Sequence, residues 1–230
     1  MDKHHSNTDF EGSWIAGDGW AVLAIAGIAT IILTLISLPV GTFALGLMVW
    51  LRHILRSPRR LSPDAPGLVL APADGVVIEV ADRIDAPPMA DPSSGDLAGE
   101  SGARRVTIRT GLADVQLQRS PVAGRIIDNF LIPGLFRGGE EMDLTRRDNE
   151  RREISIETED GARFLVAQIG TATARQLVCR YGPGKFLAAG APLGMARIGG
   201  LTELVIPAGH QLEIEVGKTV VAGETILARR

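Results

Sequence analysis

The chain has few of the side chains that act as nucleophiles or general bases. Its single cysteine, Cys179, ends an apolar stretch at residues 176–179, and this setting indicates a buried, inert thiol. Only one histidine, His210, lies beyond residue 53, and the last serine is Ser155. A serine nucleophile needs an adjacent base, and no Ser-His pair can be built from residues beyond 155. His210 itself follows Pro-Ala-Gly, a turn that favours an exposed ring.

Charge and cysteine content exclude two further classes of protein. A net charge of −3 over 230 residues lacks the basic surplus of most nucleic-acid-binding proteins, so we expect no nucleic-acid partner. One cysteine excludes an internal disulfide framework and a zinc site built on a cysteine cluster. We therefore predict no metal site.

The region 61–230 has the sequence pattern of short strands separated by turns rich in Gly and Pro. Any functional residues in this region must therefore be held by strands and turns. A mostly β fold, a barrel or sandwich, follows from this pattern. No amphipathic helix of normal length is predicted, and residues 86–102, rich in Pro, Ser, Asp and Gly, are expected to form a surface loop. The expected strands are 68–70, 75–80, 105–109, 125–131, 153–157, 163–169, 176–179, 194–198, 203–206 and 210–216, with 221–227 as an additional candidate.

An internal repeat sharpens this fold prediction. Residues 184–194 and 217–227 share the pattern G-K-x-x-x-A-G-x-x-(I/L), which is typical of lipoyl- and biotinyl-type hammerheads. We therefore expect a barrel/sandwich hybrid of the lipoyl-hammerhead type. A carrier function is disfavoured, because carriers need a lysine at an exposed hairpin tip, whereas Lys185 and Lys218 lie inside the repeats.

The apolar excess of the chain lies near the N-terminus. Residues 20–51 contain no charged residue, a run longer than the roughly 20 residues that span a bilayer. Pro39 and Gly41 interrupt it. We interpret residues 1–60 as a tail and a membrane hairpin, re-entrant or tightly spanning, with one span plus an interfacial helix as the alternative.

Four arginines follow this run directly. They lie between residues 52 and 60, and the positive-inside rule places this side of a membrane in the cytoplasm. They either only set the topology or also attract anionic headgroups. The predicted location is the cytoplasmic membrane, with the domain 61–230 facing the cytoplasm.

The order of motifs along the chain resembles the phosphatidylserine decarboxylase family in its short, bacterial and archaeal form. The resemblance covers roughly residues 19–228 and rests on the joint order of the motifs, since no single motif is decisive. These motifs are the apolar hairpin followed by Arg-Ser-Pro-Arg-Arg, Pro-Ala-Asp-Gly at 72–75, Arg-Ser-Pro-Val-Ala-Gly at 119–124, Asp-Asn-Glu-Arg at 148–151, Gln-Ile-Gly at 168–170 with Ala-Arg at 174–175, Gly190 with Gly194, and Arg-Ile-Gly at 197–199.

This resemblance implies a membrane-associated lyase that makes phosphatidylethanolamine in phospholipid metabolism. The family's cofactor is a pyruvoyl group made from the protein itself. An Asp-His-Ser set cleaves a Gly-Ser bond, and the serine becomes the pyruvoyl group. That group acts as an electron sink while CO₂ leaves the substrate.

Two of the three positions that the resemblance implies are replaced here. Asp74 matches the family's acid, although an Asp-Gly pair also suits an ordinary turn. Gln116 stands where the family has its histidine, and an amide cannot take a proton near neutral pH. Gly199 and Gly200 stand at the Gly-Ser cleavage position, and Gly200 has no hydroxyl from which a pyruvoyl group could form. Thr202 is the nearest hydroxyl, but it follows Leu201 instead of a glycine.

Arg119 and Arg175 are the candidate substrate-binding residues. A guanidinium forms paired hydrogen bonds with phosphate or carboxylate, as headgroup recognition would require. The alternative for each of them is a structural ion pair.

Three hypotheses follow for the function. The leading one is a membrane-anchored pseudoenzyme of this family, without a pyruvoyl group or any other cofactor, which binds membrane phospholipid or pairs with an active paralogue or with a second copy of itself. The alternative is an active phosphatidylserine decarboxylase. The third is a membrane-tethered interaction module without lipid specificity.

Overall fold

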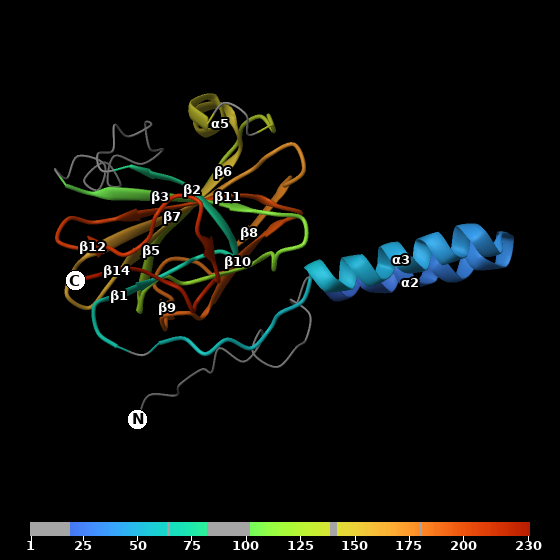
Figure 1. The fold of residues 1–230 in the computed structure, drawn as a ribbon, viewed down its shortest axis with the longest axis horizontal. Coiled ribbons are helices and arrows are strands. Elements are labelled where there is room, and N and C mark those ends of the chain that lie inside the picture. The colour runs from blue at the N-terminus through green and yellow to red at the C-terminus, as the bar shows by residue number, and fades with distance from the viewer. Residues whose placement is uncertain (1–18, 64, 82–101, 139–141, 180) are drawn as a thin grey trace. The chain divides into compact units, whose positions relative to one another are not determined.

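The computed structural model describes residues 19–63, 65–81, 102–138, 142–179 and 181–230. The chain divides into two compact units, Met1–Arg59 and Arg60–Arg230. The second unit carries every strand of the described chain (Figure 1). The predicted loop at 86–102 lies almost entirely outside the described residues.

Two helices, α2 (Gly19–Ile36) and α3 (Leu38–Ile54), form the described part of the first unit and pack along each other. Pro39 lies in the first turn of α3, where its missing N–H costs no hydrogen bond. Gly41 lies so close to Thr34 that a β-carbon at residue 41 would overlap the threonine side chain. The predicted break between two apolar segments is therefore present.

Many large apolar side chains of these helices are exposed, among them Leu35 at 84% and Phe43 at 77%. No helix in the described part of the chain is both long and apolar enough to cross a membrane. The spanning form of the predicted hairpin is thus not found.

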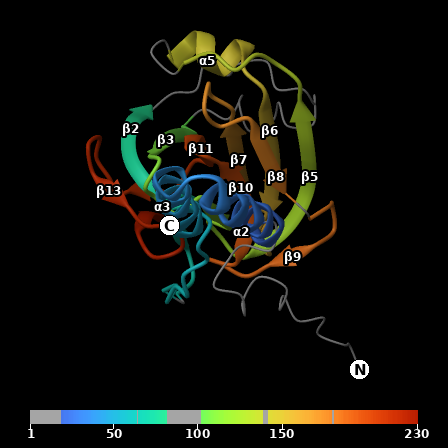
Figure 2. The same ribbon diagram turned by 90° about the vertical axis from the view of Figure 1, so that its right-hand side faces the viewer.

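The second unit is mostly β, as predicted. Its largest sheet has eight strands in the order β13-β2-β3-β11-β7-β6-β5-β9, and Figure 2 shows it curling into an arc. Two three-stranded sheets, β1-β14-β12 and β4-β10-β8, complete the fold. The strands are β1 (Leu68–Leu70), β2 (Gly75–Ala81), β3 (Arg104–Thr110), β4 (Leu117–Arg119), β5 (Gly124–Ile132), β6 (Arg151–Glu157), β7 (Arg163–Ile169), β8 (Gln176–Cys179), β9 (Phe186–Leu187), β10 (Pro192–Arg197), β11 (Gly200–Ile206), β12 (Gln211–Leu212), β13 (Thr219–Val220) and β14 (Ile226–Arg229).

Alternation of side chains gives the curled sheet an apolar inner face. Val106, Leu204, Val166 and Ile154 are direct cross-strand neighbours on β3, β11, β7 and β6, and all four are fully buried. Successive residues of a strand point to opposite faces. The next row, which includes Thr107, Glu203 and Glu153, therefore lies on the outer face.

The two G-K repeats adopt the same local structure near the two ends of this sheet. Gly184 and Gly217 have φ of +91° and +89°, and Gly190 and Gly223 have +73° and +74°. The first repeat leads into β9, which pairs with β5, and the second leads into β13, which pairs with β2. The repeat predicted from sequence is thus a repeat of structure.

Several predicted strands need correction. The stretch 210–216 contains only the two-residue β12, and 221–227 is mostly a turn, since β13 ends at Val220 and β14 begins at Ile226. The short strands β4, β9 and β13 were not predicted, nor was the helix α5 (Met142–Asp148).

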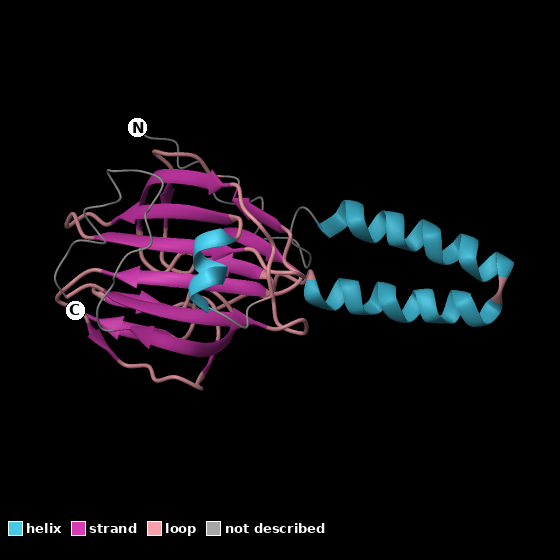
Figure 3. Ribbon diagram, turned by 90° about the horizontal axis from the view of Figure 1, so that it is seen from above, coloured by secondary structure: helices cyan, strands magenta, loops and turns pink. Residues whose placement is uncertain are grey.

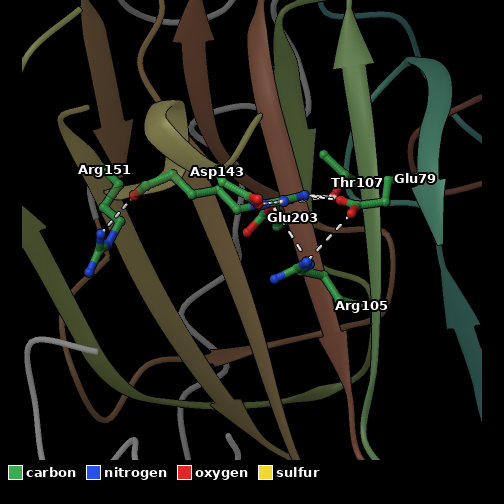
Figure 4. A network of polar contacts seen from close by, with 7 residues as sticks. Glu79, Arg105, Thr107, Asp143, Arg151 and Glu203 are labelled. Carbon is green, nitrogen blue, oxygen red and sulfur yellow. Dashed lines mark hydrogen bonds and ion pairs between the residues drawn. The ribbon is translucent and has the colours of Figure 1, made fainter. Parts of the chain in front are cut away.

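Helix α5 lies over the outer face of the sheet (Figure 3). Its Arg146, only 4% exposed, contacts Glu79 and Glu203 and donates a hydrogen bond to Thr107 at 3.1 Å. Arg105 lies 3.6 Å from Glu79 and 4.0 Å from Glu203, between the same carboxylates (Figure 4). Ion pairs therefore hold this helix on the sheet.

Candidate functional site

The turn between β10 and β11 has an unusual backbone. Ile198, Gly199 and Gly200 have φ of +66°, +83° and +120° in succession. Ile198 is the one non-glycine residue with positive φ in the described ranges, and a β-branched residue is strained there. Strain of this kind is concentrated at functional sites. The turn coincides with the segment that resembles the family's processing site.

Gln116 is hydrogen-bonded directly to this turn. Its Oε1 accepts the Gly199 N–H at 2.6 Å, while its Nε2 donates to the carbonyls of Gly111 at 3.1 Å and Asp114 at 2.8 Å. The side chain is 2% exposed, so these bonds form away from water. Gln116 thereby links the loop after β3 to residue 199, and the structure brings these two predicted site residues together.

Gly200 lies at the start of β11, opposite Thr110 of β3. A β-carbon built on it would lie 3.1 Å from Ala174 Cβ and 3.4 Å from the Ile169 carbonyl oxygen. The first distance is tighter than ordinary packing, and the φ of +120° already favours glycine. The local fold is therefore adapted to glycine at residue 200.

Asp74 approaches the site through its backbone. Its carbonyl accepts a hydrogen bond from Thr110 Oγ1 at 2.8 Å. Its carboxylate is bound elsewhere, by the Arg60 guanidinium at 2.8 Å and by the Ala222 N–H at 2.7 Å. In the described contacts the carboxylate makes no hydrogen bond to Gln116, so this geometry ties Asp74 to the fold rather than to residue 116.

The two candidate arginines lie in different surroundings. Arg119 is 8% exposed and donates to the Gly190 carbonyl at 2.7 Å, beside the junction of the two repeats. Arg175 is exposed, donates to the Ala172 carbonyl and lies 5.7 Å from the centre of the Phe136 ring. Arg175 directly follows Ala174, whose Cβ would lie 3.1 Å from a β-carbon built on Gly200, but its described contacts are with Ala172 and Phe136 and not with the turn.

A buried polar cluster beside the site was missed by sequence reasoning. Gln118 Nε2 donates to Thr202 Oγ1 at 2.7 Å, and Gln168 Nε2 donates to Gln118 Oε1 at 2.6 Å. All three side chains are at most 2% exposed. Thr202 is two residues beyond Gly200 and so points to the same face. The alternation of residues along β11 could have pointed to Thr202 as a neighbour of the site. Gln118 and Gln168 could not be placed beside Thr202, because they lie on other strands whose register the sequence does not reveal.

These contacts limit the chemistry available at the turn. Amides and hydroxyls donate and accept hydrogen bonds but do not titrate near neutral pH. Gln168 Oε1 is buried and has no hydrogen-bond partner among the described residues. The hydrogen-bonding side chains of the site supply neither a general base nor a nucleophile with an adjacent base.

The other reactive side chains are bonded away from this turn. Cys179 Sγ contacts the Tyr181 carbonyl at 3.7 Å, and burial raises the pKa of the thiol, which favours its unreactive neutral form. His210 Nδ1 lies 3.0 Å from the Pro207 carbonyl oxygen, with the ring edge-on to Phe164. Among the described residues no group of three or more His, Cys, Asp or Glu side chains is arranged to hold a metal ion.

Comparison with known proteins points to the same family as the order of motifs in the sequence. The family model for phosphatidylserine decarboxylase matches residues 48–228. The phosphatidylserine decarboxylase proenzyme of Ruegeria pomeroyi is 31% identical over 211 residues, covering 92% of this chain and 93% of that protein. The proenzyme of Geobacter sulfurreducens is 32% identical over 223 residues, covering 94% and 97%. That of Beijerinckia indica is 32% identical over 213 residues, covering 93% and 88%.

Proposed function

The chain belongs to the phosphatidylserine decarboxylase family, and we propose that it is a member that remains uncleaved and binds phospholipid without decarboxylating it. The observation that carries this proposal is Gly200. A pyruvoyl group must keep the β-carbon of the residue from which it forms, and glycine has none. The residues present therefore do not fit the family's cofactor, and no catalytic step is assigned through it.

The neighbours of Gly200 support the same proposal. Gln116 occupies the position that the resemblance gives to the base, and its three hydrogen bonds hold two loops together. A side chain used in this way positions the turn but removes no proton. Headgroup binding would use Arg175, which is exposed and directly follows Ala174, a neighbour of Gly200.

Attachment to a bilayer is the second part of the proposed function. The α2–α3 hairpin exposes large apolar side chains, including Leu35 and Phe43, and Arg52 in the last turn of α3 is followed by Arg56 and Arg59. An apolar surface next to arginines suits the boundary between acyl chains and anionic headgroups. We place the hairpin in the cytoplasmic membrane as a partly inserted anchor, with the β unit on the cytoplasmic side.

Vesicle flotation tests this attachment. With vesicles of phosphatidylethanolamine and an anionic phospholipid, we expect Leu35→Glu combined with Phe43→Glu to lower the floated fraction at least tenfold. Two buried charges in the acyl region cost several kcal/mol, more than the apolar contacts they replace. Val216→Glu, at an apolar position of the β unit that is 58% exposed, should float as the parent chain does. Equal flotation of all three proteins would disprove anchoring by the hairpin.

An assay of CO₂ release from phosphatidylserine tests the proposed absence of decarboxylase activity. Full-length protein incubated with phosphatidylserine vesicles is expected to bind them and to release no CO₂. Arg175→Ala should weaken binding to anionic vesicles with no effect on neutral ones. Release of CO₂ at a rate proportional to protein concentration would support the alternative, an active decarboxylase.

A further inference from the structure

A cavity of about 550 Å³ lies at the end of the β unit away from Gly200. Phe164, at the start of β7, lines it, whereas Ile169, at the other end of β7, lies opposite Leu201, next to Gly200. Five residues of strand at about 3.3 Å each separate the two places by roughly 16 Å. The cavity is therefore distinct from the site at the turn 198–200. Its volume lies within the range of about 300–1,000 Å³ typical of small-molecule sites.

Apolar side chains form the walls of this cavity. Val69, Val122 and Phe164 belong to the buried core and form part of its lining. Phe186 of β9 adds an aromatic ring that is 45% exposed. The exposed part of the Phe186 ring is apolar surface in contact with water. An apolar ligand chain bound in the cavity would cover that surface.

One end of the cavity is polar and carries excess negative charge. The Asp160 carboxylate is already used, since it pairs with Arg230 and accepts a hydrogen bond from Thr158. Glu159 is exposed and has no ion-pair partner among the described residues. His210, also in the lining, keeps its Nδ1 against the Pro207 carbonyl and presents a ring edge to Phe164. The unbalanced charge at this end is therefore the Glu159 carboxylate.

We propose that this cavity binds a single-chain amphiphile with a cationic amine head, its alkyl chain along the apolar walls and its ammonium group beside Glu159. Charge complementarity selects the head: a carboxylate or phosphate would be repelled by Glu159, and the guanidinium of Arg230 in the described lining is paired with Asp160. This site is independent of the proposed phospholipid binding at the turn 198–200.

Photoaffinity labelling of the full-length protein tests the site. The probe is dodecylamine with a photoreactive diazirine in its chain, and the comparison probe carries a carboxylate head on the same chain. Mass spectrometry of the labelled peptides is expected to place the amine on residues 65–69, 158–164 and 186–189, with at least fivefold less labelling there by the carboxylate probe. Equal labelling by both probes, or labelling confined to residues 19–54, would overturn the proposal.

Two variants with a matched control sharpen this test. Glu159→Gln should lower amine labelling of the cavity at least fivefold, while Glu215→Gln, an exposed carboxylate outside the lining, should leave it unchanged. Ala189→Trp should occupy part of the cavity and lower labelling there by both probes. Equal effects of the two glutamine variants would contradict a role for Glu159.

Discussion

Replacing Arg146 by methionine is expected to destabilise the β unit by about 3–5 kcal/mol, because it leaves the buried Glu203 carboxylate without its main counter-charge. Arg146 is 4% exposed and contacts both Glu203 and Glu79. Glu203 is itself 5% exposed, so water cannot replace the lost partner. Arg105, 4.0 Å from Glu203, offers only a partial substitute.

Urea unfolding of the full-length protein measures this loss. Arg163→Met is the matched control, since Arg163 pairs with Glu157 at the surface and such pairs contribute about 0–1 kcal/mol. Adding Glu203→Met to Arg146→Met should restore part of the stability, because replacing both members of a buried pair removes the unpaired charge. If Arg146→Met costs no more than Arg163→Met, α5 is not held by this cluster.

Gln116→His combined with Gly200→Ser is expected to cause partial self-cleavage and release residues 200–230. The amide of Gln116 already lies at hydrogen-bond distance from Gly199 N, so an imidazole there would adjoin the bond to be broken. The introduced serine would supply the missing hydroxyl. The β-carbon of this serine would crowd Ala174, and its backbone would be strained at φ +120°, which breaking the 199–200 bond would relieve.

Denaturing gels and intact mass reveal this cleavage, and the design includes its own controls. Gln116→His with Gly200→Ala imposes the same backbone strain without a hydroxyl and should stay intact. Variants with only one of the two changes should stay intact as well, since each supplies only the imidazole or only the hydroxyl. A folded but uncleaved double variant would mean that the site differs from the family's in more than these two residues.

Most strands could be predicted because turns rich in Gly and Pro mark their ends. The expected ends of β1, β7 and β8 are correct to the residue. The helix α5 could not be predicted in the same way. Its segment Met142–Asp148 has no apolar stripe, and ion pairs such as that of Arg146 with Glu203, 57 residues away, hold it in place.

The sequence pointed to residues of the candidate site but not to the contacts between them. The resemblance pointed to Gln116 and Gly199, yet their hydrogen bond joins positions 83 residues apart and depends on the pairing of β10 and β11 with their neighbours. Asp74 binds Ala222, 148 residues away, through the second repeat. Contacts of this kind follow from strand register, which local sequence patterns do not specify.

The intact mass of the purified full-length chain tests most directly whether this family member processes itself. A single species at the full chain mass of 24.5 kDa is the predicted result. Two species, one of them a C-terminal fragment beginning at residue 200, would contradict it and would show that self-cleavage proceeds without a serine at that position.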